Sequence, residues 1–125
     1  RNAMTKKAYN GWTNYETWVT NLWIGNEQGS SNYWHDQAVA ELKHAKSDKT
    51  FTKDEIAKLA LADALTEHHE LALPEVQGFA ADLLGAAMSK VNWEEIAGSL
   101  IDNVKAETLG GEALDSARAA LANDK

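Results

Sequence analysis

A run of aromatic and apolar residues near the N-terminus, from Gly11 to Ile24, constrains the fold of this chain most strongly. It contains three of the five tryptophans. Thr13 followed three residues later by Glu16 is the pattern of a capping box, in which both side chains satisfy free backbone donors at a helix start. The large residues that follow recur at helical spacing and predict one buried face: Tyr15, Trp18, Val19, Leu22 and Trp23.

The boundaries of the first two helices follow from small and polar residues. The first helix is expected to end between Asn26 and Gly29, where glycine can adopt a left-handed cap. A second helix is expected to begin within residues 30–32. Its apolar positions form a single stripe: Trp34, Ala38, Leu42 and Ala45.

Two further helix starts repeat the capping pattern, at Thr52 with Glu55 and at Asn92 with Glu95. The helix after Thr52 is predicted to run to about Leu71. Its wide apolar face is typical of a central helix that is contacted from more than one side. The helix after Asn92 is predicted to bury one set of residues: Trp93, Ile96, Ala97, Leu100, Ile101 and Val104.

Proline and a glycine pair mark the remaining boundaries. Pro74 is predicted to lie in the first turn of a fourth helix. That helix is expected to bury Val76, Phe79, Ala80, Leu83, Leu84, Ala87 and Met88. Gly110 and Gly111 are predicted to break the chain and to leave residues 112–123 as a weakly anchored sixth helix. No hairpin dipeptide stands between alternating segments. The expected fold class is therefore all-α, a compact single-domain bundle of five to six helices.

The length of 125 residues is that of one domain. Residues 1–3 before Met4 look like a cloning remnant, so residues 1–12 are expected to be a tag remnant and a flexible N-terminal segment. Residues 13–123 are expected to form the single helical domain. No apolar run approaches the roughly 20 residues that span a bilayer. The N-terminus also lacks the apolar core of a signal peptide. We therefore expect a cytoplasmic protein without a membrane partner.

The acidic balance limits the partners that this chain can bind. Its formal net charge is −7. Affinity for phosphate depends on lysine and arginine, so this charge disfavours direct binding to nucleic acid or to anionic lipid. An acidic surface suits a protein partner with a basic surface, but it also suits solubility alone.

The residue patterns of common catalytic and cofactor sites are missing. His68 and His69 are adjacent and diverge on a helix, and no second motif completes a two-metal site. The glycine pair lacks the lysine of a phosphate-binding loop. We therefore predict no catalytic residue, no metal and no cofactor. The alternative is a small metal-binding or enzymatic helical domain that uses carboxylates with histidines 35, 44, 68 or 69.

Aromatic residues at helix edges and the acidic helix faces are the best candidates for contact with a partner. Exposed aromatic residues concentrate binding energy at protein interfaces, and carboxylates complement a basic groove. The candidate residues are Tyr9, Trp12, Tyr33, Glu41, Asp54, Glu55, Asp63, Glu67, Glu70, Glu94 and Glu95. Single-stranded nucleic acid stacked on this aromatic edge is an alternative, with Lys6 and Lys7 as its nearby cations. A homodimer that packs through the last helix stays open.

Two segments carry a resemblance to a known group of proteins. The motif Trp12-Thr13-Asn14-Tyr15-Glu16-Thr17-Trp18, continued by Leu22-Trp23-Ile24, Asn26-Glu27 and Tyr33-Trp34, resembles that of small uncharacterised proteins of phages, plasmids and other mobile elements. The segment from Val91 to Ala97 resembles their second signature. The resemblance implies a genetic context and no mechanism. By analogy with such proteins, it suggests a non-enzymatic inhibitor of host defence, either antirestriction or anti-CRISPR in type.

Overall fold

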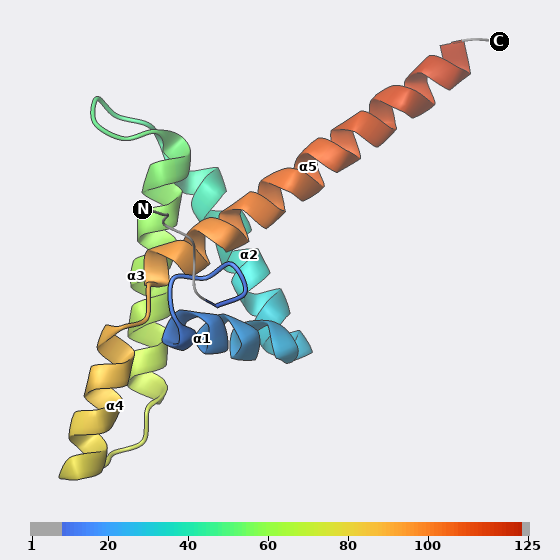
Figure 1. Cartoon of the computed structure of the whole chain (residues 1–125). Coiled ribbons are helices and arrows are strands. Elements are labelled where there is room, and N and C mark those ends of the chain that lie inside the picture. The colour runs from blue at the N-terminus through green and yellow to red at the C-terminus, as the bar shows by residue number, and fades with distance from the viewer. Residues whose placement is uncertain (1–8, 124–125) are drawn as a thin grey trace, which may run out of the picture.

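The computed structural model describes the backbone of residues 9–123 and the side chains of residues 9–108. That part of the chain is all-α, as predicted (Figure 1). Its five helices are α1 (Tyr15–Asn26), α2 (Gln28–His44), α3 (Lys53–Ala72), α4 (Phe79–Ser89) and α5 (Trp93–Asn123).

Helices α2, α3 and α5 pack against one another in all three pairs and enclose the core. The expectation that α3 is central is therefore confirmed. Leu61 and Leu65 of α3 and Ile96 of α5 are among the fully buried side chains of the core. Trp34 and Ala38 of α2 are buried against them, with Leu42 and Ala45 partly buried, as the predicted stripe requires. No helix in the described part of the chain is long and apolar enough to cross a membrane.

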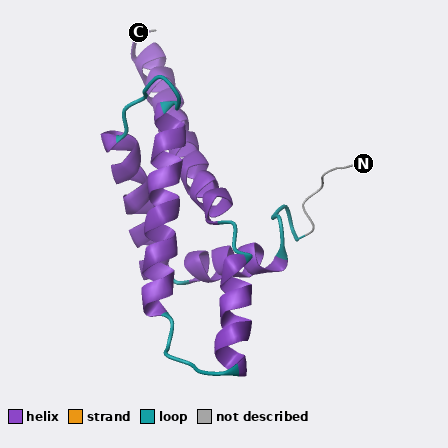
Figure 2. Cartoon of the chain, turned by 90° about the vertical axis from the view of Figure 1, so that its left-hand side faces the viewer, coloured by secondary structure: helices purple, strands orange, loops and turns teal. Residues whose placement is uncertain are grey.

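Helix α1 lies across this three-helix core and packs on α2 and α5 (Figures 1 and 2). The prediction of its buried face was wrong. Thr17 and Ile24 are the buried residues of α1, whereas Tyr15, Leu22 and Trp23 of the predicted face are exposed. The apolar spacing predicted the position of the helix. The side that faces the core is the one that carries Thr17, whose hydroxyl accepts from the N–H of Asn92.

The capping predictions have mixed outcomes. Thr52 and Glu55 form both hydrogen bonds of a capping box, as predicted. At the start of α5, the side chain of Asn92 accepts from the backbone N–H of Glu95 at 3.1 Å. The first helix is capped by Asn14 and not by Thr13, because the Asn14 side chain accepts from the N–H of Thr17. Its end at Asn26 agrees with the prediction, but the cap is Glu27 in an extended conformation and not a left-handed glycine.

Helix α4 differs most from expectation. It begins at Phe79, so Pro74 lies in the connection after α3 and not in a first helical turn. None of its residues is buried, and it forms no extensive packing with any other helix. Figure 2 shows α4 running beside the end of α3, to which a loop joins it. The predicted buried stripe of this region is thus exposed at Val76, Phe79, Ala80 and Leu83 and half-buried at Leu84, Ala87 and Met88.

Helix α5 passes through Gly110 and Gly111 without a break, so the predicted sixth helix is the continuation of α5. Glycine is a poor helix former but does not forbid a helix, and the alanine-rich residues after the pair favour one. Figure 1 shows this last part of α5 extending past the other helices. The predicted weak anchoring of residues 112–123 depends on side chains that lie outside the described residues.

The segment from Tyr9 to Trp12 forms a tight turn where flexibility was expected. Tyr9 and Trp12 exchange two backbone hydrogen bonds, of 3.1 and 2.7 Å. Asn10 and Gly11 both have positive φ, 47° and 93°, as the two central residues of a type I′ turn require. The Asn-Gly dipeptide therefore makes a hairpin turn that sequence analysis did not recognise. Residues 1–8 lie outside the described part of the chain.

Candidate functional site

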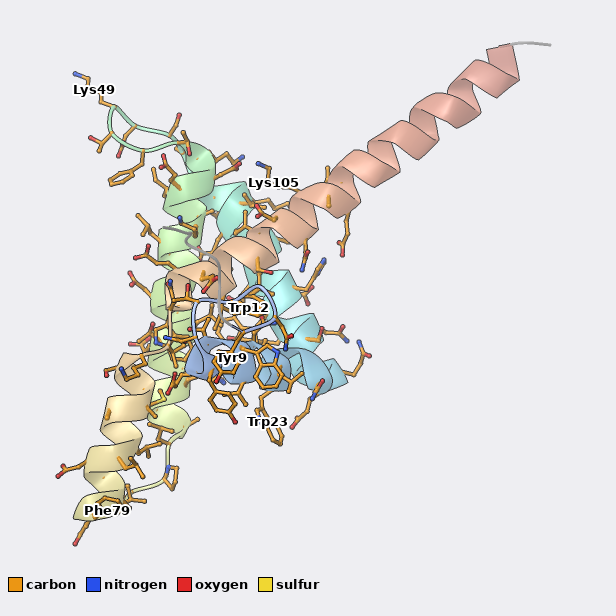
Figure 3. The ribbon with its side chains drawn as sticks, viewed as in Figure 1. Tyr9, Trp12, Trp23, Lys49, Phe79 and Lys105 are labelled. Atoms are coloured by element: carbon orange, nitrogen blue, oxygen red, sulfur yellow. The ribbon has the colours of Figure 1, made fainter. Side chains whose placement is uncertain are left out.

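An open cleft of about 580 Å³ lies where the Asn10–Trp12 turn meets α3 and α5. Trp12 forms part of its wall and is itself packed against the core. The α5 side of the cleft carries three carboxylates, Glu94, Glu95 and Asp102, and α3 contributes Lys58. Figure 3 shows Trp12 beside Tyr9 in front of the helices.

A second hollow, of about 130 Å³, shares Lys58 and Asp102 with the first and continues it between α3 and α5. Asp54 and Glu55 line this extension. We call the two hollows together the α3–α5 cleft. Its lining contains five carboxylates and one lysine, so it is strongly acidic. Asp54 also forms an ion pair with Lys105 of α5, and this hydrogen-bonded pair raises the pKa of the lysine.

The residues after Trp12 clamp the N-terminal segment onto the start of α5. The N–H of Thr13 donates to a carboxylate oxygen of Glu95 at 3.2 Å. The side chain of Asn14 donates to the carbonyl of Lys90 at 2.7 Å. The N–H of Asn92 donates to the hydroxyl of Thr17 at 2.8 Å. These three bonds, which we call the α1–α5 clasp, hold Trp12 at the edge of the cleft.

The structure brings five of the eleven candidate residues together in the α3–α5 cleft: Trp12, Asp54, Glu55, Glu94 and Glu95. Three of these carboxylates already have structural contacts, since Asp54 pairs with Lys105, Glu55 completes the capping box and Glu95 accepts from Thr13. Sequence reasoning missed Lys58 and Asp102. The spacing of Glu95, Ser99 and Asp102 would have placed Asp102 on the same helical face as Glu95.

The other six candidates do not line this cleft. Tyr9 and Tyr33 are 44% and 47% exposed, but they belong to different ring clusters. Tyr9 packs edge-on against Tyr15, whereas Tyr33 contacts Trp34 and His68. The remaining acids are spread over α2 and α3 outside the cleft: Glu41, Asp63, Glu67 and Glu70. The acidic residues of the cleft therefore form one local site. The acidic candidates as a whole do not form a continuous stripe on the surface.

The histidines lie in two structural settings. His69 stacks between Trp34 and Trp93, and its Nδ1 donates to the carbonyl of Leu65 at 2.7 Å. Burial lowers the pKa of His69. His35 is at the surface, where its Nε2 lies 2.7 Å from Glu107, and the hydrogen bond to that carboxylate raises the pKa of His35. In the described part of the chain, histidine and carboxylate side chains form no group that could hold a metal ion.

Comparison with known proteins places this architecture in a family. No curated protein and no solved structure matches the chain. A family model, described as a family of unknown function (DUF7249), matches residues 5–115. The matched region contains Trp12, the α1–α5 clasp and every residue that lines the α3–α5 cleft. The chain therefore belongs to the DUF7249 family, whose function is unknown.

Proposed function

We propose that this chain is a non-catalytic binding protein that holds a lysine- or arginine-rich segment of a protein partner in the α3–α5 cleft. The observation that carries the proposal is the position of Trp12 beside Glu94 and Asp102 in one open cleft. Carboxylates bind guanidinium and ammonium groups through charge-assisted hydrogen bonds. An indole face attracts the same cations. The cleft volume lies within the range of about 300–1,000 Å³ for ligand sites.

The same cleft is a poor site for nucleic acid. A single-stranded base could stack on Trp12, but its phosphates would meet the carboxylates of α5. Lys58 is the one cation in the described lining, against five carboxylates. A basic protein segment has the complementary charge, and this complementarity accelerates encounter and improves selectivity.

The biological setting that we propose is the cytoplasm of a bacterial host of a mobile element. The support is the resemblance of the Trp12–Trp18 motif to proteins of phages and plasmids. Restriction and CRISPR nucleases bind DNA or RNA through basic grooves, because neutralising phosphate requires lysine and arginine. An acidic protein that occupies such a groove would compete with nucleic acid and would need no catalytic site.

Affinity capture with charge-matched variants tests the proposal. We would compare Glu94→Gln/Asp102→Asn, which removes two carboxylates from the cleft, with Asp63→Asn/Glu67→Gln, which removes two from the exposed surface of α3. Both variants have the same net charge. We expect a basic protein to be captured by the wild type and the surface variant and to be lost with the cleft variant. Equal loss with both variants would show that net charge, and not the cleft, determines capture.

A further inference from the structure

Helix α4 has an apolar face that the described chain covers only in part, since its second half is half-buried and its first half is exposed. Phe79 and Leu83 are 80% and 59% exposed, and α4 contains no buried residue. The helix has 11 residues. Isolated helices shorter than about 12–15 residues are marginally stable in water, so most helices depend on tertiary packing. Helix α4 therefore needs a partner surface in order to be stable.

The apolar face of α4 continues onto α1. A hollow of about 190 Å³ joins the two helices, with Tyr15 and Val19 on one side and Ala87 and Met88 on the other. Beyond it on α1, Trp23 is 66% exposed. Figure 3 shows Trp23 below α1, at the end of this helix away from α4, with Phe79 at the far end of α4. We call this combined surface the α1–α4 face.

The area of the α1–α4 face suits a protein–protein interface. Its exposed large hydrophobic residues, together with those at the end of α3 and in the following loop, are Tyr15, Leu22, Trp23, Leu71, Leu73, Val76, Phe79 and Leu83. An aromatic side chain contributes about 150–250 Å² when it becomes buried. A standard interface takes about 800 Å² from each partner. These eight residues can supply much of that area.

The distribution of charge indicates a second copy of the same chain as the occupant. The protein has 31 charged residues and a net charge of −7, so two copies repel each other over most of their surfaces. Helices α1 and α4 are exceptions, because Glu16 is the one charged residue of α1 and Asp82 is the one charged residue of α4. At α1 and α4 two copies can meet with few opposed carboxylates, whereas Glu70 and Glu75 flank the adjoining Leu71, Leu73 and Val76. A membrane surface is a poorer occupant, because neither helix has the lysine and arginine residues that attract anionic lipid.

We propose that the chain forms a twofold-symmetric dimer in which the α1–α4 faces of two copies cover each other. In a twofold interface the same patch is used by both subunits, so a self-complementary apolar face is sufficient. This interface is separate from the α3–α5 cleft, whose lining includes no residue of α1 or α4. Each subunit of the dimer keeps its own cleft.

Mass measurement by light scattering across a wide range of protein concentration tests this proposal. We expect the wild type to have twice the 13.7 kDa mass of the chain and Phe79→Ser/Leu83→Gln to have the mass of one chain. Phe51→Ser is the matched control, because Phe51 is also exposed, at 41%, but precedes α3 at the end of the bundle away from α4. It should remain dimeric.

Two further measurements make the outcome decisive. Hydrogen exchange of the α4 amides should slow as the protein concentration rises, since dimerisation stabilises this helix. Near-ultraviolet circular dichroism should show that the double variant keeps its core, because neither substituted residue is buried. A wild type that stays monomeric at every concentration would overturn the proposal. So would a dimer that the double variant does not disrupt, or a monomer that binds lipid vesicles through α4.

Discussion

Thr17 is the one buried polar side chain in the described part of the chain, and it has no exposed surface. Its hydroxyl accepts from the N–H of Asn92, which lies 75 residues away. Asn14 and Thr13 add two more bonds to the start of α5. The two sequence motifs that carry the resemblance, around Trp12 and around Trp93, are thus the two sides of one clasp. Their polar residues join backbone groups, two exposed and one part-buried, of segments that lie far apart in the sequence.

Replacing Thr17 with valine should destabilise the fold. Valine has nearly the same shape, but it cannot accept from the part-buried N–H of Asn92, and the net contribution of one such hydrogen bond is about 0.5–1.5 kcal/mol. The free energy of unfolding, measured by urea denaturation, should fall by that amount. Thr17→Ser is the control, since it keeps the hydroxyl and should restore most of the hydrogen-bond contribution. Equal stability of the valine variant and the wild type would contradict a role for this bond.

The two histidines with shifted pKa values should affect stability in opposite directions. Contact with Glu107 raises the pKa of His35, so its contribution is complete below about pH 6.5 and is lost as the pH rises through the folded-state value. Burial lowers the pKa of His69, so its contribution is present above about pH 6.5 and is lost as the pH falls through the folded-state value. An NMR titration should place the midpoint of His35 above that of His69. The reverse order would contradict these assignments.

At the scale of elements, local signals predicted two helix starts and the buried faces of α2 and α5, but not the start of α4 or the buried faces of α1 and α4. The start signals at Thr52 and Asn92 were confirmed, because capping depends on residues three positions apart. The faces of α1 and α4 were predicted to be buried, but the structure leaves more than half of their residues exposed and the rest half-buried. Helical spacing shows that a helix has an apolar side, but it does not show whether this chain or another molecule covers that side.

The glycine pair in α5 gives a prediction for an element. Gly110→Ala/Gly111→Ala should stabilise the C-terminal part of α5, because glycine disfavours a helix by about 1 kcal/mol per residue relative to alanine. Helicity measured by far-ultraviolet circular dichroism should rise, and amide exchange beyond residue 105 should slow. A fall in helicity would instead show that the glycines hold a break in the helix.

The whole molecule combines a three-helix core with two surfaces of different chemistry. The α3–α5 cleft is acidic, and the α1–α4 face is apolar and almost free of charge. Sequence analysis identified Trp12 and four of the five carboxylates of the cleft but missed Asp102. It also could not separate these residues from Asp63, Glu67 and Glu70. The cleft depends on the pairing of α3 with α5, which brings residues about 40 positions apart together. No local pattern encodes that pairing.

The central claim is that a basic segment binds in the α3–α5 cleft. An NMR titration of the whole protein with an arginine-rich peptide tests this claim most directly. We predict that the Trp12 indole and the backbone amides of residues 94–103 shift first, and that added salt weakens the effect. Glu94→Gln/Asp102→Asn should abolish the shifts, and Asp63→Asn/Glu67→Gln should preserve them. Shifts spread evenly over the acidic surface, or an equal response from both variants, would contradict the account.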